Sequence, residues 1–195
     1  MKNKLKKIVL PILKFIVCLF YDKQYIKGRY FDNSYFGYRL AFKSIWAKNI
    51  LRLSSPQKFP TAINCHVSNG KNIIFDPDDI NNFQSPGTYY QNFKAKIFLG
   101  RGSYIGPNVG IITANHIVGN LEQHEDGKDV IIGEQCWIGM NSIILPGVIL
   151  GKNTVVAAGS VVNKSFSEGN VVVGGIPAKI LKKIELNEKI NEVQK

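Results

Sequence analysis

The chain has 195 residues, of which 45% are hydrophobic and 20% are charged, and 18 of them are glycines. This composition suits one domain with a modest extension, and it excludes both wholesale disorder and two full catalytic domains. The net charge of +11 is concentrated at one end, because residues 1–60 hold 13 Lys and Arg against only Asp22 and Asp32, whereas residues 61–195 hold 12 of each sign. A neutral body with a basic arm indicates contact with an anionic surface such as a membrane, rather than with nucleic acid.

The first predicted element is an interfacial anchor at the N-terminus. Four lysines within the first seven residues precede an apolar stretch from residue 8 to residue 21, which Pro11 and Lys14 interrupt. This stretch is shorter than the roughly 20 residues that a membrane-spanning helix needs, and no small-residue cleavage site of a signal peptide follows it. We therefore expect it to lie at the inner face of the cytoplasmic membrane, with its lysines near the lipid headgroups.

The next predicted element is a helix from residue 36 to residue 53. Its apolar residues form one stripe at helical spacing: Tyr38, Phe42, Ile45, Trp46, Ile50 and Leu53. Its basic residues lie outside this stripe: Arg39, Lys43, Lys48 and Arg52. The helix either braces the main domain or is a second membrane-facing element, and both roles are compatible. Residues 1–60 are thus predicted to form a basic, helical N-terminal region.

A six-residue repeat dominates the body of the chain, residues 61–179. Aliphatic residues recur in two phased runs: Leu99, Ile105, Ile111, and then Ile132, Ile138, Ile144, Leu150, Val156 and Val162. A period of six indicates short strands joined by tight turns, three to a triangular coil, with the aliphatic side chains inside. The sequence therefore predicts a mainly β protein in which stacked coils pair as parallel strands.

A protruding loop interrupts this repeat. Ile111 and Ile132 are 21 residues apart, so a segment at 114–129 is expected to leave the coil before the next repeat resumes. Loops that project from a rigid scaffold often carry function. This loop contains Asn115, His116 and His124, together with the carboxylates of Glu122, Glu125 and Asp126.

The last predicted element is a C-terminal helix over residues 180–195. It would cap the open end of the coils and cover a sheet edge that could otherwise pair with another chain. The three cysteines, Cys18, Cys65 and Cys136, lack the paired spacing of a disulfide framework or a zinc knuckle. A reducing cytoplasmic location is therefore expected.

These motifs resemble the hexapeptide-repeat acyltransferases. The runs Gly110–His116 and Val130–Gly139 are similar to those of the galactoside, maltose and xenobiotic O-acetyltransferases and the polysaccharide acetyltransferases, and the likeness covers roughly residues 85–183. The resemblance implies a left-handed parallel β-helix, a homotrimer with clefts between neighbouring prisms, acetyl-CoA as the co-substrate, and no metal.

His116 is the candidate catalytic residue. It matches the histidine that acts as general base in this family, and imidazole titrates near working pH, as a base that deprotonates an attacking hydroxyl should. A carboxylate or a backbone carbonyl must orient its other ring nitrogen. Glu122, Glu125 and Asp126 are all candidates, and the sequence does not choose among them.

The later coils are expected to bind the coenzyme. By resemblance, Trp137 lines the channel of the pantetheine arm, and the backbone of the Trp137–Gly139 segment contacts it. The small side chains of Gly139, Ala157 and Ala158 would let a narrow chain lie close to the backbone.

Phosphate groups at the far end of coenzyme A call for cations. Lys164 matches a family position near the nucleotide, as does Lys179 in the Gly175–Lys179 run, and Lys182 follows them. For the acceptor, Asn92 resembles an acceptor-binding asparagine of the sugar acetyltransferases, and Asn115 and His124 of the loop are further candidates.

The leading functional hypothesis is an acetyl-CoA-dependent O-acetyltransferase that acts on a sugar hydroxyl of a cell-surface or lipid-linked glycan. One alternative is a soluble acetyltransferase for a small sugar, a nucleotide sugar or a xenobiotic. Two others are a zinc carbonic anhydrase, which uses a similar β-helix with three histidines, and a membrane-bound scaffold without catalysis.

Overall fold

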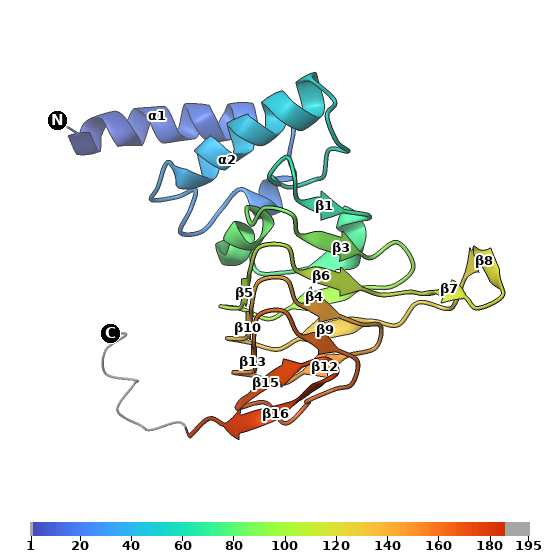
Figure 1. The fold of residues 1–195 in the computed structure, drawn as a ribbon. Coiled ribbons are helices and arrows are strands. Elements are labelled where there is room, and N and C mark those ends of the chain that lie inside the picture. The colour runs from blue at the N-terminus through green and yellow to red at the C-terminus, as the bar shows by residue number, and fades with distance from the viewer. Residues whose placement is uncertain (1, 186–195) are drawn as a thin grey trace.

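The computed structural model describes residues 2–185, with side chains from residue 8 onward. Helices occupy one end of the molecule, and coils of short strands extend from them (Figure 1). The helical elements of the N-terminal region are α1 (Lys2–Val17), a 3₁₀ turn η1 (Lys23–Tyr25), α2 (Phe36–Ser44) and a π-helical turn η2 (Ile45–Ile50).

The coils form a prism with three sheets, which we call A, B and C. Sheet A contains β1 (His66–Val67), β3 (Tyr89–Gln91), β6 (Gly110–Ile112), β11 (Ile143–Ile144) and β14 (Val161–Val162). Sheet B contains β2 (Ile73–Ile74), β4 (Ile97–Leu99), β9 (Val130–Ile132) and β12 (Ile149–Leu150). Sheet C contains β5 (Tyr104–Ile105), β10 (Trp137–Ile138), β13 (Val155–Val156), β15 (Val171–Gly175) and β16 (Ala178–Lys183).

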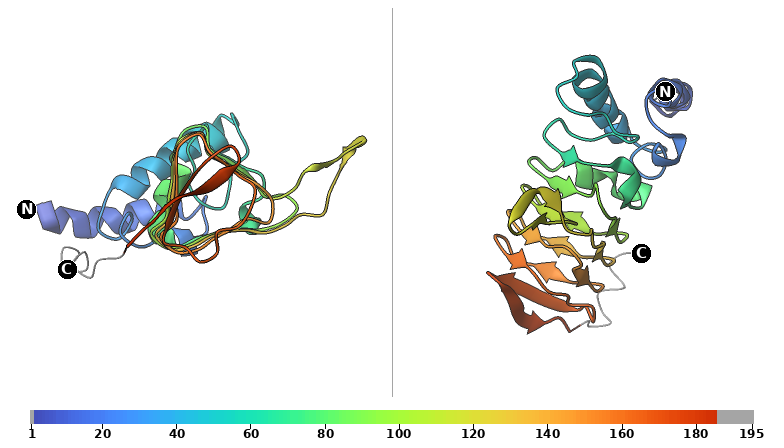
Figure 2. Two further views of the ribbon diagram at one scale, coloured as in Figure 1. Left: turned by 60° about the horizontal axis from the view of Figure 1, so that its bottom comes forward. Right: turned by 90° about the vertical axis from the view of Figure 1, so that its right-hand side faces the viewer.

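The view down the prism axis shows these coils superimposed as a triangle (Figure 2). Neighbouring strands within each sheet are parallel, apart from the last pair in sheet C. The six-residue period predicts these stacked triangular coils of parallel strands, and the fold is the left-handed parallel β-helix that the resemblance to the hexapeptide-repeat acyltransferases implies.

The repeat places one aliphatic side chain of each hexad inside the prism. In sheet C, Ile105, Ile138, Val156 and Val173 occupy successive coils and are all buried. Burial of such a side chain contributes about 1.5–3 kcal/mol, so a stack of them holds the coils together.

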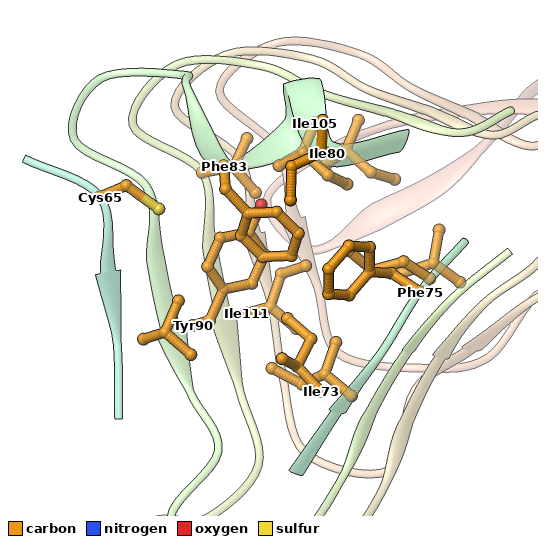
Figure 3. Packing of buried hydrophobic residues seen from close by; sticks show 14 of the residues in the cluster. Cys65, Ile73, Phe75, Ile80, Phe83, Tyr90, Ile105 and Ile111 are labelled. Carbon is orange, nitrogen blue, oxygen red and sulfur yellow. The ribbon is translucent and has the colours of Figure 1, made fainter. Parts of the chain in front are cut away.

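Aromatic residues fill the first, less regular coils next to the helices. The rings of Phe75 and Phe83 lie 4.6 Å apart, and Phe83 also contacts Phe59 and Tyr90. Figure 3 shows Phe75, Phe83 and Tyr90 converging with the aliphatic side chains of the adjoining coils. This cluster closes the N-terminal end of the prism, with the short 3₁₀ segments η3 (Gly70–Asn72) and η4 (Pro77–Phe83) beside it.

The N-terminal helices pack on this end through one face each. Val17 and Tyr21 are buried at and beyond the end of α1, and Tyr38 and Ile45 are buried in α2 and η2. The apolar stretch at residues 8–21 is therefore partly core, and only its opposite face is exposed.

Lys48 departs from the prediction that it lies on the solvent side of its helix. The π turn shifts the helical register after Ser44, and Lys48 is buried, with its Nζ donating to Thr61 Oγ1 at 2.6 Å and to the Cys65 carbonyl at 3.0 Å. Burial lowers the pKa of Lys48 and raises that of Cys65 to about 11. This lysine ties the helical region to the first coil.

The C-terminal helix predicted over residues 180–195 is wrong for residues 180–183. They belong to β16, which pairs antiparallel with β15 and brings Ala178 opposite Gly175. The free edge of β15 offers backbone hydrogen bonds that outweigh local helical preference. Residues 186–195 of that prediction lie outside the described part of the chain.

Candidate active site

A β-hairpin projects from the prism between sheets A and B. Its strands are β7 (His116–Ile117) and β8 (Asn120–His124), and Gly119 allows the tight turn between them with a φ of +90°. The hairpin extends well beyond the coils (Figure 1) and lies within the segment 114–129 that was expected to leave them. His116 stands opposite His124 across the hairpin.

Gln91 secures the base of this hairpin, a role that no motif in the amino-acid sequence indicates. Its side-chain amide donates to the Ala114 carbonyl at 2.9 Å, and its carbonyl oxygen accepts from the N–H groups of Thr113 and Ala114 at 3.0 and 3.1 Å. Ala114 is buried, so this one side chain satisfies both of its backbone groups. Gln91 thus fixes the direction in which the chain leaves β6 toward His116.

The imidazole of His116 is oriented by a backbone carbonyl. Its Nδ1 lies 2.7 Å from the Leu121 carbonyl oxygen across the hairpin. Because a carbonyl only accepts hydrogen bonds, Nδ1 carries the proton, and the lone pair of the neutral ring is on Nε2. The orienting group is therefore none of the carboxylates Glu122, Glu125 and Asp126. His116 is exposed, so this basic nitrogen belongs to a side chain at the surface of the hairpin.

His124 and Phe93 complete an aromatic stack beside His116. The two imidazole centroids are 4.1 Å apart, and the Phe93 ring meets His124 edge-on at 4.9 Å. Desolvation lowers the pKa of His124, and the nearby groups of His116 and Lys94 lower it further. His124 therefore favours its neutral form next to His116, and it supports the ring of His116 from one side.

The other two residues predicted to bind the acceptor, Asn115 and Asn92, differ in their exposure to solvent. Asn115 is exposed at the start of the hairpin, where its backbone carbonyl accepts from the Glu125 N–H at 2.9 Å. Asn92 is fully buried, and its side-chain amide forms a pair of hydrogen bonds with the backbone of Asn69 at 2.7 and 2.9 Å. The prediction that Asn92 binds the acceptor is wrong, because its amide joins two coils and is not accessible.

The predicted coenzyme site lies along the outer face of sheet C. Trp137 is 58% exposed there, and it is in register with Tyr104 on one side and Val155 on the other. The row continues through Val172 to Lys182 on β16. Strands are about 4.8 Å apart, so this row offers an aromatic platform at one end and a lysine roughly 14 Å away.

The small residues on this face also have a role in the stacking of the coils. A Cβ atom on Gly139 would lie 2.6 Å from the backbone nitrogen of Ala158 in the next coil, and Gly139 is buried. Coil stacking alone is therefore enough to require a glycine at this position, and the contact of Gly139 with the coenzyme stays a prediction. Ala157 is half-buried against Gly174, whereas Ala158 is exposed.

The three predicted phosphate-binding lysines are exposed toward the C-terminal end of the prism. Lys164 lies over the Phe166 ring at 5.6 Å, and Lys179 and Lys182 lie on β16. None of the three forms an ion pair with an acidic residue in the described part of the chain. Their charges are therefore available to an anionic ligand.

A single chain does not bring the two halves of the predicted site together. The β7–β8 hairpin with His116 projects from one side of the prism, whereas β10 with Trp137 lies on the opposite side (Figures 1 and 2). Within the described residues, no group of three His, Cys, Asp or Glu side chains is arranged to hold a metal ion.

Comparison with known proteins identifies the family. The family model "Bacterial transferase hexapeptide (six repeats)" matches residues 129–164. A galactoside O-acetyltransferase of Lactococcus lactis is 37% identical over 129 residues, which cover 59% of this chain and 62% of that protein. A Dictyostelium discoideum protein named "Putative acetyltransferase" is 38% identical over 135 residues, covering 63% of this chain and 70% of that protein.

A third relative, from Escherichia coli K12, is named "Putative lipopolysaccharide biosynthesis O-acetyl transferase". It is 32% identical over 137 residues, covering 63% of this chain and 67% of that protein. The chain therefore belongs to the hexapeptide-repeat acyltransferase family, as its motifs indicated. Its match spans less than two thirds of the Lactococcus protein.

Proposed function

We propose that this protein is an acetyl-CoA-dependent O-acetyltransferase that modifies a sugar hydroxyl of a cell-surface or lipid-linked glycan at the inner face of the cytoplasmic membrane. The observation that carries the proposal is the hydrogen bond from His116 Nδ1 to the Leu121 carbonyl, on the hairpin of a hexapeptide-repeat acyltransferase. It leaves Nε2 as the basic nitrogen of an exposed, fixed imidazole.

In this mechanism His116 Nε2 accepts the proton of the acceptor hydroxyl while the hydroxyl oxygen bonds to the thioester carbonyl carbon. The carbon–sulfur bond then breaks, the proton passes from the imidazolium to the departing thiolate, and His116 is neutral again. The Leu121 carbonyl keeps Nδ1 protonated throughout, so the same nitrogen serves as base and then as acid.

The residues on sheet C fit the coenzyme that this reaction requires. Trp137 offers an exposed apolar surface for its arm, and Lys164, Lys179 and Lys182 offer cations that no carboxylate of the described residues neutralises. The bound coenzyme supplies the activated acetyl group.

Replacement of His116 tests the catalytic assignment. We expect His116→Ala to lower kcat by about 10²–10⁴-fold, the usual contribution of general base catalysis, with unchanged affinity for coenzyme A by calorimetry. His66→Ala is the matched control, because His66 is an exposed histidine on β1 outside the hairpin. Retention of more than a tenth of the activity by a folded His116→Ala protein would refute the base assignment.

We also propose that the enzyme is a homotrimer whose sites lie between subunits. The separation of His116 and Trp137 on one chain supports this, because the hairpin of one copy must meet sheet C of another. An apolar column on the outer face of sheet B, formed by Ile74, Phe98, Ile131 and Ile149 in register, supports self-association.

A mixing experiment tests this arrangement. His116→Ala and Trp137→Ala subunits, each defective alone, are unfolded and refolded together. Shared sites predict that mixed trimers regain part of the activity, because some sites receive both an intact histidine and an intact tryptophan. Activity that stays at the level of the separate variants, with a trimeric mass by light scattering, would place each site within one chain.

Membrane contact is supported by the outward face of α1. Its exposed apolar residues follow helical spacing: Ile8, Ile12, Phe15 and Ile16, and Leu19 is exposed just beyond its last residue. They lie opposite the inward-facing Leu10, Leu13 and Val17, which pack on the core. A helix that is apolar on both sides requires a second apolar environment. No helix in the described part of the chain is long and apolar enough to span a bilayer.

Charge placed on this face tests the contact. Phe15 is 70% exposed, so Phe15→Glu should fold normally yet reduce co-sedimentation with anionic phosphatidylglycerol vesicles. Gln24→Glu adds the same charge to an exposed position on η1 and should leave sedimentation unchanged. Equal binding by both variants would exclude α1 as the contact.

A glycan assembled on a membrane-bound carrier is the acceptor that best combines these features. The name of the E. coli relative refers to lipopolysaccharide biosynthesis, which is membrane-bound glycan chemistry. A screen of lipid-linked and free sugar acceptors with radiolabelled acetyl-CoA checks this. Preference for a free small sugar would overturn it.

A further inference from the structure

An apolar groove lies between α2 and the first coil, outside the candidate active site. It has a volume of about 530 Å³, which is within the range of small-ligand sites. Leu40, Ala47 and Ala62 form its apolar lining, and the exposed rings of Phe36 and Trp46 border it.

Two cations stand at this groove. Arg39 and Lys43 are one turn apart on α2, so they project from the same face of the helix, and both line the groove. Neither forms an ion pair with a carboxylate of the described residues. By contrast, Lys14 of the same region is paired with Asp32 at 2.9 Å.

The groove is continuous with an exposed apolar edge of the helical region. Trp46, which is 60% exposed, borders the groove, and Phe42 and Ile50 are exposed one turn before and after it. A ligand that enters from a lipid surface can therefore keep its apolar part against protein side chains along the whole path.

We propose that this groove binds a lipid phosphate with a single apolar chain. The apolar lining and the bordering rings take the chain, and Arg39 and Lys43 take the phosphate through charge-assisted hydrogen bonds. One groove of about 530 Å³ holds one chain end, which favours a single-chain lipid over a two-chain phospholipid. The inference rests on the proposed function, because it identifies the carrier end of a lipid-linked acceptor as the part that the helical region recognises.

Fluorescence of Trp46 gives a direct measurement. The chain contains two tryptophans, so a full-length Trp137→Phe protein reports on Trp46 alone. We expect farnesyl phosphate to shift its emission with saturable binding, whereas inorganic phosphate leaves it unchanged and farnesol binds more weakly. In the same background, Arg39→Ala/Lys43→Ala should raise the dissociation constant by at least about 10-fold.

The matched control is Lys23→Ala/Lys27→Ala, which removes the same charge from exposed positions of the helical region outside the groove. It should change the dissociation constant less than twofold. Three results would each overturn the proposal. They are an equal loss of affinity for farnesyl phosphate in both double variants, equal affinity for farnesol and farnesyl phosphate, and higher affinity for short-chain phosphatidic acid. The titration uses no acetyl-CoA, so an enzyme that binds farnesyl phosphate but fails to transfer acetyl groups would overturn the proposed function and not this inference.

Discussion

Replacement of Gln91 by Leu is expected to impair catalysis without direct contact between residue 91 and the substrate. The side-chain amide of Gln91 makes three hydrogen bonds to the backbone of Thr113 and Ala114, at the point where the hairpin leaves the prism. Leucine keeps the approximate size of the side chain but makes none of these bonds. His116 lies two residues beyond Ala114, so the backbone that carries it is then no longer held in a fixed direction.

The expected magnitude follows from the groups left without partners. The Thr113 N–H keeps a second acceptor, the backbone carbonyl of Gln91, so only the two backbone groups of buried Ala114 lose their partners. Each unsatisfied buried group costs about 1–3 kcal/mol. The two groups together therefore cost about 2–6 kcal/mol. The lower end of that range, about 2–3 kcal/mol, corresponds to a roughly 30–150-fold loss of kcat/KM if it falls on the placement of the hairpin.

This cost lowers either the rate of catalysis or the stability of the fold. Steady-state kinetics with acetyl-CoA measures the first effect, and thermal unfolding measures the second. We expect kcat/KM to fall while coenzyme A affinity stays constant, because Gln91 is on β3 of sheet A and not on sheet C. Gln57→Leu is the matched control, since Gln57 makes a single hydrogen bond, to the Val67 carbonyl, in another coil. A fall of less than threefold in Gln91→Leu would refute the positioning role.

Three further outcomes are expected. The pKa of His124 is lowered in the folded protein, so His124 contributes its full stability above its unfolded pKa of about 6.5. This contribution is lost as the pH falls through the lower folded pKa. Amide exchange should show that the hairpin loosens at acid pH, and that it loosens less in His124→Phe. Asn92→Ala should lower stability by about 2–4 kcal/mol through loss of its bonds to Asn69, and calorimetry should show this while the acceptor KM stays within twofold. Gly139→Ala should cost about 1–3 kcal/mol in denaturant unfolding, because its Cβ would press on the backbone of Ala158; an unchanged midpoint would contradict the stacking role.

The repeating part of the molecule was predictable because each coil presents the same environment to the same position. Ile138 and Ile144 are one period apart, and both are buried inside the prism. The burial of these side chains follows from the period alone, without knowledge of any residue that is distant in the sequence. The place of the hairpin follows in the same way, because a broken period requires the extra residues to leave the coil.

Polar roles were not predictable, because they depend on partners far along the chain. Gln91 and Asn92 are neighbours in sequence, yet one holds the hairpin and the other joins two coils. Their partners Ala114 and Asn69 each lie 23 residues away, in opposite directions. The choice of Leu121 over three nearby carboxylates to orient His116 likewise depends on the register of the hairpin, which local composition does not determine.

The positive charge in residues 1–60 is only partly available to a membrane, because the structure places some of these cations in contacts within the protein. Several of these charges serve the fold itself: Lys48 is buried among uncharged acceptors, and Lys14, Arg29 and Lys58 face Asp32, Asp79 and Asp22. The net charge of +11 therefore overstates what the described helices present to a lipid surface. The stronger argument for that surface is apolar, because the outward face of α1 has no partner among the described residues. Arg39 and Lys43 border an apolar groove, and neither has an acidic partner among the described residues. This combination of unpaired cations and an apolar groove, rather than the total charge, distinguishes recognition of a lipid phosphate from general attraction to a membrane.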